Sequence, residues 1–365
     1  MAHNIENNNG VYSFVENKKS GLAWHGLGER VDGAMFVNEA LKLSHADYSV
    51  EMRPVMVLSP DIQQRMLNGE KFTEDELIDL TIPKTMATIR TDINRSLGVV
   101  SDTYGIVQNA DAFKFLDTLV SGKLADRDNT PVIETAGVLG RGERVFVTAK
   151  FPQQIVLDAR RDDLVDMYAV FTTSHDGTGA VSCLITPVRV VCNNTLNLAL
   201  NQNRGRINFR HSSNIMSRMN LLDSENAEFT YKTLNLYDVY SKSLKEQFDH
   251  LRNIKVSEKE LDNILADVLL SEDAAKIFHE THNIDSDGIK TRGRNIFNNV
   301  KKAMEYGIGQ DIQERGTALW AINGLTTYYQ NSASFTTDEK KFNSLMDGNA
   351  YEKIQKAQEL LLATA

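Results

Sequence analysis

The sequence predicts an α+β fold, in which an antiparallel β-hairpin sheet with flanking helices precedes an all-helical C-terminal region. Two alternating apolar runs flank a glycine turn at 140–142, and two more flank 175–179, as expected of β-hairpins. From residue 213 onward, apolar residues recur at helical spacing almost without interruption. We therefore expect an α+β domain over 1–212 and a helical C-terminal region over 213–365.

The first third of the chain is expected to mix short helices with strands. Residues 36–44 have helical spacing, whereas 48–58 are β-branched and extended. Thr73 is predicted to cap one helix, and Asn109 is predicted to cap another over 110–120. Further strands are expected within 86–92, 96–109, 133–151, 164–174 and 180–185.

Helices dominate the remainder of the chain. Residues 195–202 predict a helix at the end of the α+β domain. In the C-terminal region, Ser257 and Glu260 have the spacing of a capping box, in which each satisfies a backbone N–H of the other's turn. Helical runs follow at 261–270, 296–306, 316–330 and 351–362.

The composition and the absence of common motifs argue against several classes of protein. The share of apolar residues, 41%, is that of a chain with a packed core, and no apolar run is long enough to cross a membrane. Cys183 and Cys192 lie in apolar runs without metal-ligand spacing, so we expect reduced core cysteines. Common nucleotide, metal and hydrolase motifs are absent, so no cofactor is expected and enzymatic activity is not favoured.

One segment has an unusual charge distribution. Residues 177–222 contain no Asp or Glu, although the chain carries 49 acidic and 40 basic residues. We call this segment the acid-free strip. In an extended conformation, alternate residues of 204–210 share one face, with Phe209 on the other. Guanidinium groups that follow phosphates and rings that stack on bases are typical of single-strand nucleic-acid binding. The alternative is a solvated sheet edge with Phe209 in the core. The candidate arginines are Arg189, Arg204, Arg206, Arg210 and Arg218.

The segment 175–179, here the HDGTG loop, is the second candidate site. Asp176 and Gly177 are typical of a hairpin turn, with Gly179 easing the exit, and this interpretation is favoured. It makes His175 an exposed turn residue whose loss leaves folding intact. In two alternatives, the backbone N–H groups bind an anion, or His175 and Asp176 bind a metal.

Three stretches together resemble a known family. They are WHGLG at 24–28, HDGTGAVSCLITPVRVVCNNTLNLAL at 175–200 and GTALWAINGLTTYY at 316–329. They are similar to the phage/plasmid-like proteins of unknown function, which are carried by phages, prophages and conjugative elements. The resemblance covers roughly residues 15 to 330. It implies a mobile-element setting and the cytoplasm of a bacterial host, and it supplies no catalytic residues.

Three functions remain open at this stage. The first is a DNA-metabolism protein that binds single-stranded nucleic acid, expected to be DNA, as a homo-oligomeric annealing or recombination protein. A net charge of −9 argues against duplex binding over the whole surface but allows a local basic groove. The second is an interaction protein that inhibits or redirects a host defence pathway. A nucleotide- or metal-dependent enzyme that uses His175 and Asp176 is the third.

Overall fold

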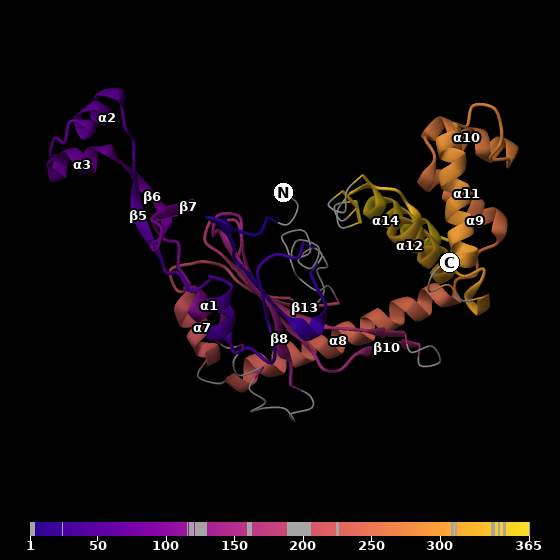
Figure 1. Ribbon diagram of the computed structural model, residues 1–365, viewed down its shortest axis with the longest axis horizontal. Helices are drawn as coiled ribbons and strands as arrows, with labels where there is room; N and C mark the ends of the chain where they lie inside the picture. The colour runs from indigo at the N-terminus through magenta and orange to yellow at the C-terminus, as the bar shows by residue number, and fades with distance from the viewer. Residues whose placement is uncertain are drawn as a thin grey trace. The chain divides into compact units, whose positions relative to one another are not determined.

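The computed structural model describes residues 4–23, 25–114, 116, 120, 130–158, 163–187, 206–223, 226–307, 310, 312–336, 340–341, 344–345 and 348–364. The chain forms two compact units, His3–Tyr240 and Ser241–Ala365 (Figure 1). The predicted boundary at 212/213 marks where helices take over from strands. Helix α7 (Ile215–Asp223) and about half of α8 (Asn226–Asn253) nevertheless belong to the first unit.

A seven-stranded sheet forms the centre of the first unit. Its order is β14-β13-β12-β9-β8-β3-β4, and every pair is antiparallel except β3 with β4. The predicted hairpins are β8–β9 and β12–β13, so the α+β class is confirmed. The bounds are β3 Phe14–Asn17, β4 Glu29–Val31, β8 Val132–Leu139, β9 Arg144–Lys150, β12 Tyr168–Ser174, β13 Val181–Thr186 and β14 Arg206–Phe209.

The core of this unit lies on the central strands, which are buried along almost their whole length. Phe146 and Phe171 are among its largest fully buried side chains, and Cys183 is a buried free cysteine, as expected. Helices α1 (Val37–Leu43) and α4 (Asn109–Phe113) pack against this region. A ring contact of 4.7 Å between Phe151 and Tyr237 joins α8 to the end of β9.

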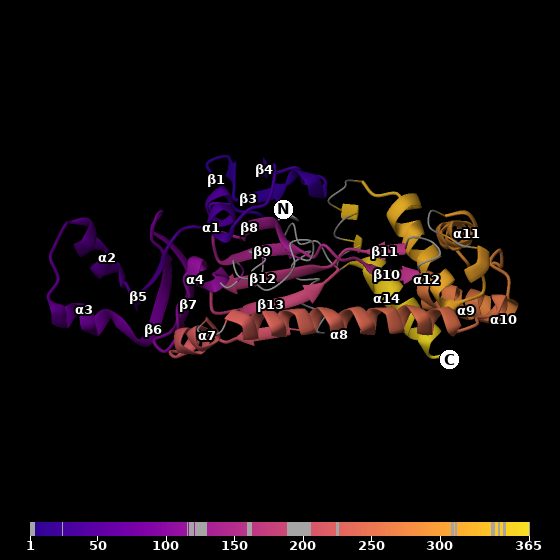
Figure 2. The same cartoon turned by 90° about the horizontal axis from the view of Figure 1, so that it is seen from below.

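A three-stranded sheet forms an arm on the first unit. Strands β5 (Val50–Met56), β6 (Thr81–Arg90) and β7 (Arg95–Ser101) pair in chain order. Helices α2 (Pro60–Leu67) and α3 (Glu74–Leu80) lie at the end of the arm that is remote from the seven-stranded sheet (Figure 1, Figure 2). The remaining short elements are β1 Asn7–Asn8, β2 Val11–Tyr12, β10 Ile155–Asp158, β11 Asp163–Val165 and the 3-10 turn η1 Lys18–Ser20.

Two of the three predicted helix caps are confirmed. Thr73 and Ser257 each form a capping box with the glutamate three residues later. The prediction for Asn109 is wrong in detail. Gln108 occupies the cap position, and Asn109 is the first residue of α4. The predicted helix at 195–202 and Cys192 lie outside the described residues.

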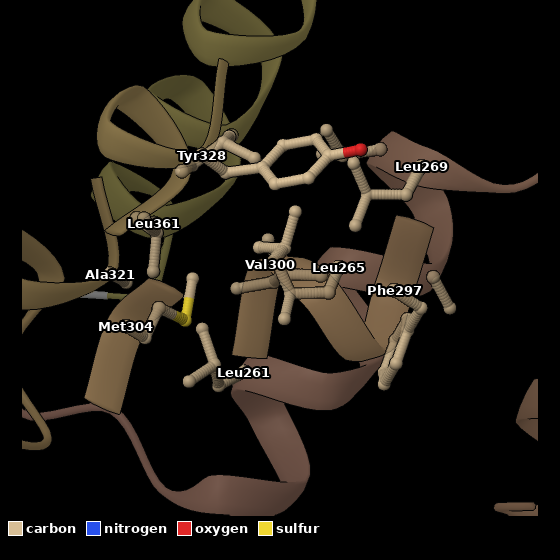
Figure 3. Close-up of a cluster of buried hydrophobic side chains, with 14 of the residues drawn as sticks. Leu261, Leu265, Leu269, Phe297, Val300, Met304, Ala321, Tyr328 and Leu361 are labelled. Carbon is tan, nitrogen blue, oxygen red and sulfur yellow. The ribbon is translucent and has the colours of Figure 1, made fainter. Parts of the chain in front are cut away.

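The second unit is built from helices around one apolar cluster. Val300 and Met304 of α11 are almost fully buried at its centre, next to Leu265 of α9 (Figure 3). Gly324 allows α12 to approach α11, because a Cβ at this position would lie 2.1 Å from Met304 Cγ. The bounds are α9 Glu258–Leu269, α10 Glu272–Thr281, α11 Thr291–Tyr306, η3 Ile312–Glu314, α12 Ala318–Thr327, the π-helical turn η4 Tyr328–Ser332 and α14 Asn349–Leu362.

Candidate nucleic-acid interface

The HDGTG loop connects β12 to β13 as a hairpin turn, as the sequence predicts. The Asp176 carboxylate accepts hydrogen bonds from the backbone N–H of Thr178 at 2.9 Å and from its hydroxyl at 2.7 Å. Gly177 has φ +78°, a conformation that favours glycine. Because Asp176 already uses the Thr178 N–H, this part of the loop is not arranged as a site for an external anion.

His175 is completely buried, so the expectation of an exposed turn side chain is wrong. Its backbone N–H donates to the carbonyl of Glu143 at 2.7 Å, and its own carbonyl accepts from the hydroxyl of Thr88 at 2.6 Å. The ring is hydrogen-bonded through Nε2 to Asn109 Oδ1 at 2.8 Å. Residues from β6, the β8–β9 turn and α4 therefore cover this end of the loop.

The hydrogen-bond network defines which nitrogen of the His175 ring carries the proton, and burial determines the charge of the ring. Asn109 donates through its amide nitrogen to the carbonyl of Ala46, so its Oδ1 is the acceptor and His175 Nε2 carries the proton. The pKa of His175 is lowered to about 4, mainly by burial and also by the nearby His211, while the Asp176 carboxylate opposes the shift. The ring is therefore neutral at pH 7. Its Nδ1 is buried without a partner among the described atoms.

His211 connects the acid-free strip to the HDGTG loop. Its ring stacks on Tyr104, with centroids 4.7 Å apart and planes 11° apart, and its Nδ1 is 2.9 Å from the Gly105 carbonyl. The Tyr104 hydroxyl donates in turn to the carbonyl of Ser174 at 2.9 Å. Burial lowers the pKa of His211, opposed by the hydrogen bond to Gly105 and by the Asp176 carboxylate. The two segments singled out in the sequence therefore meet, through residues that the sequence did not single out.

The strip runs along β14, at one end of the described sheet. Phe209 pairs with Val181 and Ile207 pairs with Cys183, so both side chains lie on the face that carries these apolar residues. Phe209 is half-buried, whereas Asn208 and Arg210 are exposed. The guanidinium of Arg218, exposed on α7, lies 5.9 Å from the centroid of the Phe209 ring.

The structure thus brings three of the predicted binding residues into one neighbourhood: Phe209, Arg210 and Arg218. Arg206 lies on β14 by its backbone, and its side chain is outside the described atoms. Arg189 and Arg204 lie outside the described residues. Within the part of the chain that is described, neither Arg210 nor Arg218 forms an ion pair.

A buried ionic network lies near the same loop. Arg90 of β6 donates to Glu6 at 2.7 and 2.8 Å and to Asp92 at 2.8 and 3.0 Å. Its guanidinium covers the Tyr48 ring at 3.9 Å, and that ring lies 6.2 Å from the His175 ring. The Tyr48 hydroxyl donates to the carbonyl of Gly142. We assign this network a structural role, because it joins the arm to the β8–β9 turn.

The metal interpretation of the HDGTG loop finds no support in the described residues. They contain no group of three or more His, Cys, Asp or Glu side chains placed to hold a metal ion, at His175 and Asp176 or elsewhere. Among the helices that are described, none combines the length and the apolar character that a membrane crossing requires.

Comparison with known proteins identifies the chain at the level of a family. No curated protein and no solved structure matches it. Residues 96–350 match a domain of unknown function, DUF932, and this match includes β12, β13, β14 and most of the second unit. Because the match covers more than half of the 365 residues, the chain belongs to the DUF932 family.

Proposed function

We propose that this protein binds single-stranded nucleic acid, with DNA as the expected form, along the edge formed by β14 and α7. The observation that carries this proposal is the placement of Arg218 over Phe209 at the sheet edge, next to the exposed Arg210. At this edge, β14 and the residue after it supply Phe209 and Arg210, and α7 supplies Arg218.

The chemistry of these side chains suits a flexible, charged strand. Arg210 and Arg218 can each contact a phosphate, and both are exposed without a carboxylate partner in the described residues. Phe209 is half-buried, so its position is held by the sheet while part of the ring remains available to stack on a base. The segment 177–222 itself contributes no carboxylate that would repel a phosphate.

The proposed binding activity suggests a role in the cell. The protein acts in the DNA metabolism of a phage or another mobile element, as a homo-oligomer that anneals or recombines single strands in the bacterial cytoplasm. The three motifs that resemble phage/plasmid-like proteins support this setting, and the sheet edge followed by helices suits such a protein. Oligomerisation would align several copies of the β14 edge along one strand.

A binding assay tests the proposal directly. Fluorescence anisotropy with a labelled single strand of about 40 nucleotides, near about 50 mM salt, should show binding by the wild-type protein. Arg210→Glu and Arg218→Glu should each weaken binding to all sequences, with unchanged circular dichroism. Lys71→Glu, an exposed cation on the arm, is the matched control and should bind like wild type.

Two results would contradict the proposal. One is the absence of binding by the wild-type protein at low salt, where phosphate contacts are strongest. The other is a loss of binding in Lys71→Glu equal to that in Arg210→Glu, because it would show a general charge effect and not a site. In the first case an acidic host protein becomes the better candidate partner for the strip.

A further inference from the structure

The second unit contains a cavity of about 810 Å³ that the proposed function does not use. It lies between the start of α11, the π-helical turn η4 and the start of α14. A volume of this size is typical of sites that enclose a small molecule. The lining combines cationic, amide and aromatic side chains.

Three of the lining residues are cationic: Lys290, Arg292 and Lys353. None of the described residues that line the cavity is acidic, although residues 241–365 as a whole contain 19 acidic and 16 basic residues. Within the described part of the chain, these three cations form no ion pair. The described lining of the cavity is therefore positively charged, although residues 241–365 as a whole carry more acidic than basic residues.

The lowered pKa of Lys353 is consistent with an excess of positive charge around it. Burial lowers its pKa, and repulsion from Arg292 and Lys356 lowers it further. Its ammonium group donates a long hydrogen bond of 3.5 Å to the carbonyl of Leu269 at the end of α9, which helps to hold the Lys353 side chain in place. That contact does not account for the side chains of Arg292 and Lys290, which form no ion pair within the described part of the chain.

The start of α11 adds an independent electrostatic feature. Lys290 is the cap residue without a side-chain cap bond, and Arg292 lies in a first turn that contains no acidic residue. The positive end of a helix dipole favours anions, and cations placed there interact unfavourably with it. An anionic ligand in the cavity would interact favourably with the helix end and with both side chains, and would thereby offset this repulsion.

The other walls of the cavity suit a planar, partly polar group. Tyr328 and Tyr329 come from η4, and such π-helical turns are frequent at functional sites. In Figure 3, Tyr328 lies across the rim of the apolar cluster, above Val300, with its hydroxyl near Leu269. Asn295 and Asn299, one turn apart on α11, add amide groups that can hydrogen-bond a heterocycle.

From this juxtaposition of three cations, two tyrosines and two amides in one cavity, we infer that the second unit binds a small phosphate-bearing aromatic molecule of the nucleotide class. Arg292 and Lys290 contact the phosphate at the positive end of α11, and Lys353 faces it from α14. The tyrosines and asparagines hold the ring. The cavity is formed by residues of the second unit and the β14 edge by residues of the first, and the inference does not depend on the single-strand proposal.

Calorimetric titration of the full chain tests this inference with four probes: AMP, ATP, adenosine and inorganic phosphate. Both nucleotides should bind, and adenosine and phosphate should each bind at least about 10-fold more weakly, because each supplies half of the contacts. Arg292→Glu should weaken nucleotide binding at least about 10-fold, since it reverses one phosphate contact. Lys302→Glu, exposed further along the same helix, should not change binding.

Each of the other outcomes would overturn the inference. They are no binding of either nucleotide up to about 5 mM, phosphate alone binding as tightly as AMP, or Arg292→Glu binding like wild type with unchanged circular dichroism. The strip variant Arg210→Glu separates the two proposals. It should bind nucleotides normally, and a loss of nucleotide binding in this variant would place the nucleotide on the β14 edge instead.

Discussion

His175 Nε2 donates a hydrogen bond of 2.8 Å to Asn109 Oδ1 inside the first unit, and both side chains are fully buried. Asn109 extends this link by donating to the carbonyl of Ala46, next to the end of α1. A turn residue of the β12–β13 hairpin is thereby joined to two helices. Buried polar links of this kind are costly to break, because the remaining partner loses both water and its hydrogen bond.

Replacing His175 should therefore destabilise the protein. We expect His175→Ala to lower the free energy of unfolding by about 2–4 kcal/mol, from a cavity and an unpaired Asn109 Oδ1. Urea unfolding followed by circular dichroism measures this loss, and faster hydrogen exchange over 168–186 would localise it. His250→Ala, at an exposed position on α8, is the control and should change stability by about 1 kcal/mol or less. Equal effects would show that the buried link adds nothing.

The same ring makes the stability depend on pH. The pKa of His175 is about 4 in the folded protein against an ordinary value of 6.5, so between these values only the unfolded chain takes up the proton. Stability from this group is complete above pH 6.5 and falls as the pH is lowered toward 4, by about 3 kcal/mol in total. His211, whose pKa is also lowered, should add to the effect in the same direction.

Urea unfolding at pH 7 and near pH 4 measures this dependence. His175→Gln is the matched variant, because its amide can still donate to Asn109 but does not titrate. It should lose less stability than wild type over this interval, by an amount that approaches the contribution of His175. An identical loss in both proteins would mean that the ring is not buried in its neutral form.

Gly177 in the HDGTG loop and Gly98 on β7, which faces the loop, should lose different amounts of stability when replaced by alanine. Gly177 has φ +78°, so Gly177→Ala should cost about 1 kcal/mol through backbone strain. Gly98 of β7 has no such strain, but a Cβ there would lie 2.5 Å from Asp176 Cα. Since backbone must move, we expect Gly98→Ala to cost about 2–3 kcal/mol.

Gly69→Ala is the control for these thermal-unfolding measurements. Gly69 has φ +74° with no atom within 4 Å of an added Cβ, so it reports strain without a clash. Gly177→Ala, whose Cβ would lie 3.1 Å from Val100 Cγ1, should match or slightly exceed it, and Gly98→Ala should exceed both. If Gly98→Ala were the mildest of the three, β7 would not contact the loop as described.

The sequence predicts features that depend on neighbouring residues. The hairpin turn at Asp176 and Gly177 and the capping box of Ser257 and Glu260 follow from patterns within a few positions, and the structure confirms both. The burial of His175 does not follow from such patterns. It depends on Thr88 of the arm and on Asn109 of α4, which are distant from the loop in the chain and lie beside it only in the folded unit.

The candidate sites show the same division. The missing carboxylates of the acid-free strip are visible in the sequence, whereas Tyr104 and His211, which connect the strip to the HDGTG loop, carry no pattern that identifies them. The cavity of the second unit was also not predicted. Its cations come from the start of α11 and from α14, and no local motif contains both.

Salt dependence should separate the two roles proposed at the β14 edge. The affinity for a single strand falls with salt because phosphate contacts release counterions, and each lost contact should lower the log–log slope by about 0.7 to 1 unit. Arg210→Glu and Arg218→Glu should therefore lower both affinity and slope. Phe209→Ala should lower affinity by about 1–3 kcal/mol per stacked base while the slope stays near that of wild type.

Anisotropy titrations at several salt concentrations provide both quantities for each variant. Phe209 is half-buried and pairs with Val181, so Phe209→Leu accompanies Phe209→Ala to separate the loss of stacking from a loss of sheet packing. Leucine keeps most of the apolar volume but offers no aromatic face, so both variants should bind weakly if the ring stacks on a base. If Phe209→Leu bound with wild-type affinity, stacking would be ruled out, and the arginine contacts alone would explain the binding. The ring would then serve to hold Arg218 in place and not to contact the strand.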